Sequence, residues 1–339
     1  MNPVLVNVWR GNAIENHHSG AAAVVDVNGR VIWSIGDIQR PVFPRSTAKL
    51  MQALTLFDPK VRKKFDTPRT ELAVACSSHI GETMHIEAVG RWLDRIGLSE
   101  DDLELGAAWP ASEPERIERI RSGLSPEKVC HCCSGNHCVF LTSALAYGDP
   151  THNYRLYAHP SQRRWFDLLS GLTGLKALQL PWGYDGCGIP TLALPLQRLA
   201  WAHARLADPS ALEPWQAEGA QEIRRAILEN PTMFAGSGEL PTLAAQLAGE
   251  ELIVKNGAEG VYTGILPRLG YGLALKIDSG DANAARVVLG AVLEKIAAVE
   301  VASWNALSDY FRPDVLNSRG EVVGRIEPSS AWDQGVLRF

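Results

Sequence analysis

The spacing of apolar and polar residues predicts strands near both ends of the chain and helices between them. Short apolar or alternating runs bounded by turn residues favour strands over 4–9, 21–27, 30–35, 251–255, 261–266, 270–276 and 319–326. Apolar residues at helical spacing predict helices over 46–56, 84–96, 161–172, 195–206, 213–228 and 281–301, and another that follows 130–138 and ends at Tyr147. The run 70–76 is interpreted as a short strand or a buried apolar segment.

The order of these elements predicts an α+β fold. Strands from both chain ends flank a helical middle portion of about 84–250, which favours an antiparallel sheet built from both ends with helices packed on it. No internal repeat or low-complexity linker marks a boundary. The whole chain, 1–339, is therefore predicted to form a single domain.

Composition excludes several classes of function. The net charge of -5 gives no basic surface for nucleic acid, and no stretch has the apolar length of a membrane span. The first residues lack the pattern of a secretion signal, so a cytoplasmic location is expected.

Ser46 and Lys49 form the first candidate catalytic motif, Ser-Thr-Ala-Lys, at the start of an apolar helix. Residues three apart share one helix face, so the hydroxyl and the amine can approach each other as a nucleophile and its base. Taken alone, Ser46 fits a helix cap better than a nucleophile, because serine is preferred at that position. Ser125 and Lys128 repeat the spacing, but Ser-Pro-Glu-Lys is typical of an ordinary helix start.

Two further segments place polar groups next to predicted strands. Residues 255–260, Lys-Asn-Gly-Ala-Glu-Gly, put a lysine where glycines allow close approach, or form an exposed turn. Residues 75–82 follow a buried run and include Ser78 and His79, which suit a site or the cap of the next helix.

Six cysteines occur in the chain, and four of them lie within 130–138. That segment and the later limb 185–190, which holds Cys187, carry thiol and imidazole groups that favour zinc. Buried cysteines beside a turn remain the alternative, because the second limb offers a single cysteine.

Taken together and in this order, seven segments resemble the rhizobial-type L-asparaginases of the asparaginase II family over about 5–328. The segments are RSTAK, CSSHIGE, HCCSGNHC, GYDGCGIPTLALPL, VKNGAEGVY, ALKIDSG and LNSRGEVVGRIEP. The resemblance implies a fold like that of serine β-lactamases, penicillin-binding proteins and serine-dependent glutaminases. It also implies a homodimer that hydrolyses a small amino acid amide.

The resemblance assigns the site residues one by one. It makes Ser46 and Lys49 one Ser-Lys tandem and Ser78 and Lys255 a second, and the sequence leaves open which serine is acylated first. It places five residues near the substrate, namely Arg45, His79, His137, Asp185 and Gly257.

The same family pattern includes a zinc ion bound by two cysteines and a lysine, which match Cys133, Cys187 and Asn136. Asparagine replaces the lysine here, and a neutral amide is a poor zinc ligand, so His137, Cys132 or water are alternatives for that position.

Three functions are compatible with these patterns. The first is an L-asparaginase acting through Ser-Lys tandems. The second is a β-lactamase or penicillin-binding-type acyl hydrolase, because that class also uses Ser-x-x-Lys. The third is a noncatalytic thiol-rich metal or redox sensor, which would leave Ser46 and Lys49 without a role.

Overall fold

The computed structural model describes residues 1–334 and 336–337, and the chain folds into two compact units. The first unit contains Met1–Thr47, Ala193–Ala211 and the chain from Leu243 onward. The second contains Ala48–Leu192 and Leu212–Thr242. The single domain expected from the sequence stays a prediction.

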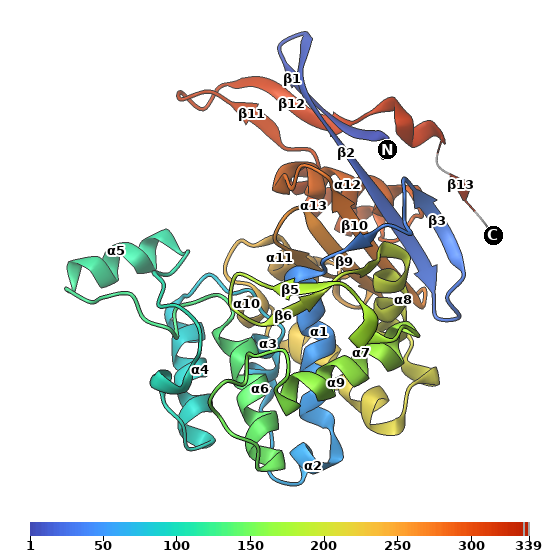
Figure 1. Cartoon of the computed structure of the whole chain (residues 1–339). Coiled ribbons are helices and arrows are strands. Elements are labelled where there is room, and N and C mark those ends of the chain that lie inside the picture. The colour runs from blue at the N-terminus through green and yellow to red at the C-terminus, as the bar shows by residue number, and fades with distance from the viewer. Residues whose placement is uncertain (335, 338–339) are drawn as a thin grey trace. The chain divides into compact units, whose positions relative to one another are not determined.

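The first unit is built on an antiparallel sheet whose strands come from both ends of the chain, in the order β11-β12-β1-β2-β10-β9-β8, with β3 beside β2 (Figure 1). The strands are β1 (Val4–Arg10), β2 (Ala13–Asp26), β3 (Val31–Ile35), β8 (Ile253–Gly257), β9 (Val261–Leu266), β10 (Tyr271–Ile277), β11 (Asp314–Leu316) and β12 (Val322–Pro328). A two-residue strand, β13 (Val336–Leu337), pairs with β3, and β4 (Pro41–Val42) pairs separately with β7 (Leu194–Pro195). The expected α+β class and its sheet from both termini are confirmed.

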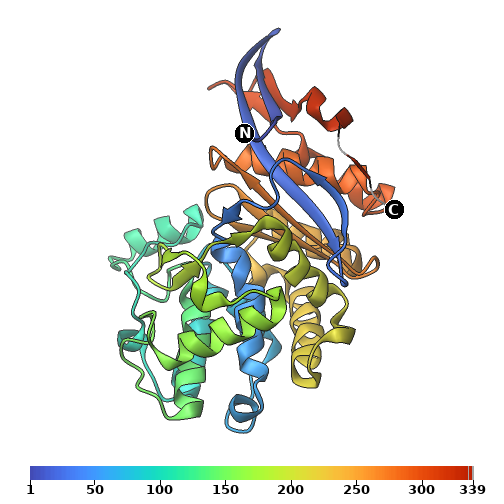
Figure 2. The ribbon, with the colours of Figure 1, turned by 45° about the vertical axis from the view of Figure 1, so that its right-hand side comes forward.

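The long strand β2 joins the two parts of this sheet. Its first half pairs with β1, and its second half pairs with β10 from Gly20 opposite Ile277 to Asp26 opposite Tyr271. Figure 2 shows this blue strand beside the orange strands of the C-terminal third. Asn28-Gly29 forms the expected turn between β2 and β3, with Gly29 at a φ of +84° that suits glycine.

Helices α8 (Leu196–Ala207) and α12 (Ala282–Lys295) pack against the sheet, and α12 also packs on α13 (Val301–Phe311). Gly272 on β10 allows α8 to approach, because a Cβ there would lie 2.0 Å from the carbonyl oxygen of Ala200. The predicted helix over 281–301 is thus two helices, α12 and α13.

The second unit is mainly helical and begins at α1 (Lys49–Gln52). Its helices are α2 (Pro59–Arg62), α3 (Arg69–Ala75), α4 (Thr83–Arg95), α5 (Glu113–Arg121), α6 (Ser134–Tyr147), α7 (Pro160–Thr173), α9 (Pro214–Glu229) and α10 (Pro231–Phe234). A small hairpin of β5 (Trp182–Tyr184) and β6 (Pro190–Leu192) also belongs to it. By sequence, the boundary between the units falls within α11 (Leu240–Leu247).

Two sequence expectations in this region are corrected. The run 70–76 is helical, as α3, because a short buried apolar run has no period that separates helix from strand. The helix expected over 46–56 is three short segments, a 3₁₀ turn (Arg45–Ala48), α1 and a second 3₁₀ turn (Ala53–Phe57). In the described part of the chain, no helix combines the length and apolarity needed to cross a membrane.

Candidate active site

The amine of Lys49 lies at the centre of a polar cluster in the second unit. It is 3% exposed, and its Nζ donates to the carbonyl oxygens of Ser77 (2.6 Å) and Cys132 (3.4 Å), to Ser78 Oγ (3.2 Å) and to Cys133 Sγ (3.2 Å). An ammonium has three N–H groups, so four acceptors share them. The cluster joins the start of α1, the loop after α3 and the loop before α6.

A buried ion pair holds this cluster together electrostatically. Hydrogen bonds from Cys132 and Cys187, together with the charge of Lys49, bring the pKa of Cys133 well below its usual range despite burial. Burial alone would lower the pKa of Lys49, but the negative charge of Cys133 raises it above its usual value. Lys49 is therefore an ammonium facing a thiolate at neutral pH.

Cys187 reaches this cluster from the loop between β5 and β6. Its hydrogen bond to Cys133 and its burial raise its pKa, so Cys187 is the thiol and Cys133 the thiolate of the pair. The loop is set by Asp185, whose N–H donates to Ile189 O (2.8 Å) and whose Oδ1 accepts from the N–H of Gly186 (2.7 Å). The two cysteine limbs of the sequence are thus brought together.

His79 is a fully enclosed neutral imidazole. Its Nδ1 accepts from the N–H of Gly81 (3.1 Å), which leaves the proton on Nε2 to donate to Ser134 Oγ (2.9 Å). Its ring stacks on His85 at 4.9 Å. Burial, then the neighbouring His85 and Lys49, keep the pKa of His79 well below its usual range.

His137, on the first turns of α6, is neutral as well. Tyr154 Oη accepts from the N–H of Glu104 (2.8 Å) and lies 2.6 Å from Nδ1 of His137; we assign Tyr154 as the donor of this second bond, which places the proton of His137 on Nε2. Burial lowers the pKa of His137 to about 3. Its Nε2 is buried and has no hydrogen-bond partner within the described residues, so it is a donor in need of an acceptor.

The start of α6 fixes the positions of Cys133, Asn136 and His137. A Cβ at Gly135 would lie 2.4 Å from a methyl group of Val74, so only glycine lets this turn pack so closely on α3. Asn136 is 2% exposed, and its Nδ2 donates to Gln52 Oε1 (3.1 Å).

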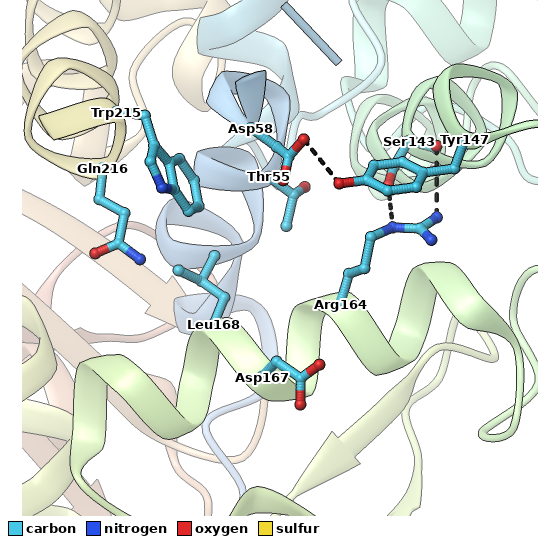
Figure 3. Close-up of a pocket in the computed structure, with 9 residues that line it drawn as sticks. All are labelled: Thr55, Asp58, Ser143, Tyr147, Arg164, Asp167, Leu168, Trp215 and Gln216. Atoms are coloured by element: carbon cyan, nitrogen blue, oxygen red, sulfur yellow. Dashed lines mark hydrogen bonds between the residues drawn. The ribbon is translucent and has the colours of Figure 1, made fainter. Parts of the chain in front are cut away.

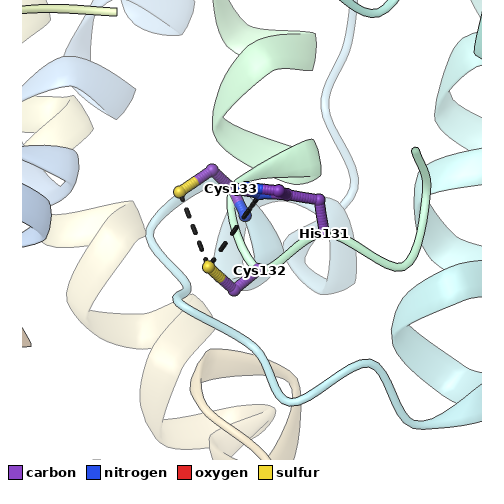
Figure 4. Close-up of side chains that lie close together, drawn as sticks. All are labelled: His131, Cys132 and Cys133. Atoms are coloured by element: carbon purple, nitrogen blue, oxygen red, sulfur yellow. Dashed lines mark hydrogen bonds between the residues drawn. The ribbon is translucent and has the colours of Figure 1, made fainter. Parts of the chain in front are cut away.

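Donor atoms for zinc are present at Cys133, although the third ligand differs from the family pattern. The sulfur atoms of Cys133 and Cys187 are in hydrogen-bond contact, which fits two thiolate ligands on one ion. The amide nitrogen of Asn136 donates to Gln52, so only its Oδ1 could face an ion, and its place in the ligand set stays a prediction. His131, Cys132 and Cys133 offer ligand atoms that all lie within 4.8 Å of one another (Figure 4).

The remaining expected residues belong to the first unit and are described within it. A Cβ at Gly257 would lie 3.1 Å from Pro44 O and 3.3 Å from Arg45 Cβ, so the end of β8 runs against the segment that leads to Ser46. Arg45 has a φ of +51°, strained for a residue with a side chain, and lies 4.0 Å from a carboxylate oxygen of Glu259. A non-glycine residue held in this conformation is common at functional sites.

Lys255 lies on the same strand as Gly257 and is fully buried. Its Nζ donates to the main-chain oxygen (2.8 Å) and the Oδ1 (2.9 Å) of Asn256. Ser78 and Lys255 belong to different units, and their pairing stays a prediction.

Sequence reasoning missed the residues that orient these groups: Gln52, His131, Ser134 and Tyr154. Ser134, Tyr154 and Gln52 contact His79, His137 and Asn136 from 55, 17 and 84 residues away along the chain. No local spacing signals contacts of this range.

The profile of the L-asparaginase II family matches residues 6–328. The chain belongs to the L-asparaginase II family. The family consists of amidohydrolases, and the resemblance seen in the sequence is thereby confirmed.

Solved structures similar to this chain include a β-lactamase from Mycobacterium bovis, with 13% identity, a TM-score of 0.43, and coverage of 86% of this chain and 95% of that one. A D-alanine carboxypeptidase from Burkholderia cenocepacia has 12% identity, a TM-score of 0.41, and coverage of 86% and 93%. Such low identities concern the course of the backbone alone. No curated protein matches the sequence.

Proposed function

We propose that this member of the L-asparaginase II family hydrolyses the side-chain amide of L-asparagine to L-aspartate and ammonia. The observation that carries the proposal is the hydrogen bond of 3.2 Å from the buried amine of Lys49 to Ser78 Oγ, in a chain that matches the family over 6–328. A serine beside a desolvated lysine is a recurrent arrangement for acyl transfer.

In the proposed reaction, a serine oxygen attacks the amide carbon and its proton passes to a lysine amine. The C–N bond then breaks, ammonia leaves with a proton, and the acyl group remains as an ester on the serine. Water hydrolyses this ester and restores the serine. As the resemblance implies, we assign one tandem to Ser46 and Lys49 and a second to Ser78 and Lys255, and the contact of Lys49 with Ser78 Oγ would let the two tandems exchange a proton. The nucleophile is one of these two serines.

The protonation state of Lys49 determines when it can act as a base. Because the thiolate of Cys133 raises its pKa, the neutral amine is a minor form at neutral pH and grows as the pH rises. Until then the ammonium donates to Ser78 Oγ and favours the anionic form of that oxygen. The proposal therefore includes a rate that increases from neutral to alkaline pH.

His137 has the role of an N–H donor to the substrate in this proposal. Its proton is on Nε2, which has no acceptor within the described residues, and a buried unpaired donor costs about 1–3 kcal/mol. A carboxylate or carbonyl oxygen of the substrate would satisfy it. Arg45, His79, Asp185 and Gly257 complete the substrate-binding set that the resemblance assigns.

Zinc is proposed at Cys133 and Cys187, where it would position the loop or the substrate while a serine remains the nucleophile. The proposal also keeps the homodimer and the cytoplasmic location expected from the sequence. Light scattering coupled to gel filtration checks the dimer.

Ammonia release from asparagine, glutamine and a β-lactam tests the function. We expect release from asparagine, weaker or no release from glutamine, and no opening of the β-lactam. Protein that is silent with asparagine at millimolar concentration, from neutral to alkaline pH, would refute the proposal. Opening of the β-lactam would favour the acyl hydrolase instead.

A further inference from the structure

A pocket lies in the helical unit, lined by residues that the candidate active site does not use. Its volume is about 340 Å³, which is in the range of small-ligand sites. It is bounded by the second 3₁₀ turn, the N-terminus of α2, the last turns of α6, the middle of α7 and the first turn of α9. The lining residues are Thr55, Asp58, Ser143, Tyr147, Arg164, Asp167, Leu168, Trp215 and Gln216 (Figure 3).

The aromatic and apolar lining gives the pocket a surface for a flat or aliphatic body. Figure 3 shows Trp215 and Gln216 on one side and Tyr147 and Arg164 on the other, with Leu168 and Thr55 between them. Trp215 is half-buried in the first turn of α9 and Leu168 is buried. An indole face beside carboxylates is a preferred surface for an organic cation.

The charges of the lining favour a cation over an anion. Arg164, the basic lining residue, is already neutralised, because its Nη2 donates to Asp149 Oδ2 at 2.6 Å and its Nε donates to Ser143 Oγ at 3.1 Å. Its guanidinium also lies 4.0 Å from the centre of the Tyr147 ring. Lys60 Nζ lies 4.2 Å from the centre of the same ring, and its positive charge offsets at most one of the negative charges of the lining.

Two lining carboxylates keep free acceptor capacity. Asp58 Oδ1 accepts from Tyr147 Oη and from the N–H of Lys60, both at 2.9 Å, whereas Oδ2 has no hydrogen bond within the described residues. Asp167 is exposed and has neither a hydrogen bond nor an ion pair in the part of the chain that the structure describes.

We propose that this pocket binds a small organic cation, an amine or amidine with a flat or apolar body, whose charged end meets Asp58 and whose body lies against Trp215, with Asp167 adding a second negative charge to the lining. The site is independent of the proposed amidohydrolase chemistry. An amidinium suits Asp58 because the N–H groups of the amidinium can donate to Oδ2 of Asp58 while Tyr147 Oη donates to Oδ1.

Calorimetric titration of the full-length protein with benzamidine and benzylamine tests the proposal. Saturable binding is expected for both, with benzamide, a neutral molecule of the same shape, and benzoate at least about tenfold weaker, since a charged hydrogen bond is worth about that factor. No saturable binding of either cation at millimolar concentration overturns the proposal. Equal binding of benzoate does so as well.

Variants locate the binding. Asp58→Asn keeps the oxygen that caps α2 and removes the charge, and it should weaken benzamidine about tenfold. Asp167→Asn should weaken it only a few-fold because exposed charges interact weakly, and Trp215→Leu should weaken it too. Asp94→Asn, on exposed α4 surface of the same unit, is the matched control. Unchanged affinity in Asp58→Asn and Trp215→Leu, with unfolding temperatures like that of the parent, overturns the assignment.

Discussion

The neutral state of His137 predicts a specific loss of stability in acid. Burial holds the folded-state pKa of His137 at about 3, whereas a histidine in the unfolded chain titrates near about 6.5. Between these values the unfolded chain binds one proton more than the folded chain, so the stability that His137 contributes is present above the unfolded value and is lost as the pH falls. The slope is about 1.4 kcal/mol per pH unit.

Replacing His137 with glutamine removes this titration while keeping a polar group beside Tyr154. Between about pH 7.5 and about pH 5, linkage gives a loss of about 2 kcal/mol from His137 alone. The wild-type free energy of unfolding should therefore fall by about 2 kcal/mol more than that of His137→Gln over this range. His79, His85 and His203 are also buried, but they are present in both proteins and cancel in the comparison.

Urea unfolding followed by circular dichroism at the two pH values measures this difference, with equal m-values as a check that the unfolding reaction is unchanged. His152→Gln, at an exposed histidine of the same unit, is the matched control and should keep the wild-type pH dependence. If His137→Gln loses as much stability in acid as the wild type, His137 is not held neutral and the donor role proposed for its Nε2 fails with it.

Three further outcomes are expected. Ser46→Ala and Lys49→Met should each lower kcat by at least ~10²-fold in the ammonia assay, and the double variant should lose no more than either single one, because the pair acts as a unit; losses that multiply would contradict this. Asn136→Lys should raise the zinc content of protein purified without chelator, and an unchanged content would count against a site at the neighbouring cysteines. Gly272→Ala should lower the unfolding free energy by about 1–3 kcal/mol because its Cβ would collide with a carbonyl oxygen of α8, whereas Gly264→Ala, whose nearest contact is 3.5 Å, should be mild; equal thermal unfolding of the two would refute the packing argument.

The sheet could be predicted from sequence because its signals are local. Apolar runs with β-branched residues mark β8 to β10, and Asn28-Gly29 marks the turn between β2 and β3. The helix α3 could not be predicted in this way. Its apolar run is short and fully buried, so its period carries no information and tertiary packing decides the conformation.

In the candidate site, too, sequence identified some features and could not predict others. Residue types and family order identified Lys49, Ser78, Cys133 and Cys187, and the structure brings these four residues of the helical unit together. Their supporting hydrogen bonds were beyond sequence reasoning. Each joins residues far apart in the chain, such as Tyr154 with the buried ring of His137, and depends on packing that no spacing records.

Lys49 shows why a motif does not determine a protonation state. Helical spacing suggests a serine and a lysine on one face, and burial of such a lysine favours the neutral amine that a base requires. The structure surrounds the same amine with the thiolate of Cys133 at 3.2 Å and with the carbonyl oxygen of Ser77 at 2.6 Å. These groups come from two other segments of the chain, and the charge of Cys133 outweighs the effect of burial on the pKa of Lys49. The pH range in which a Ser-Lys pair can work is therefore set by the residues packed around the lysine, and Cys133 is the neighbour with the greatest influence.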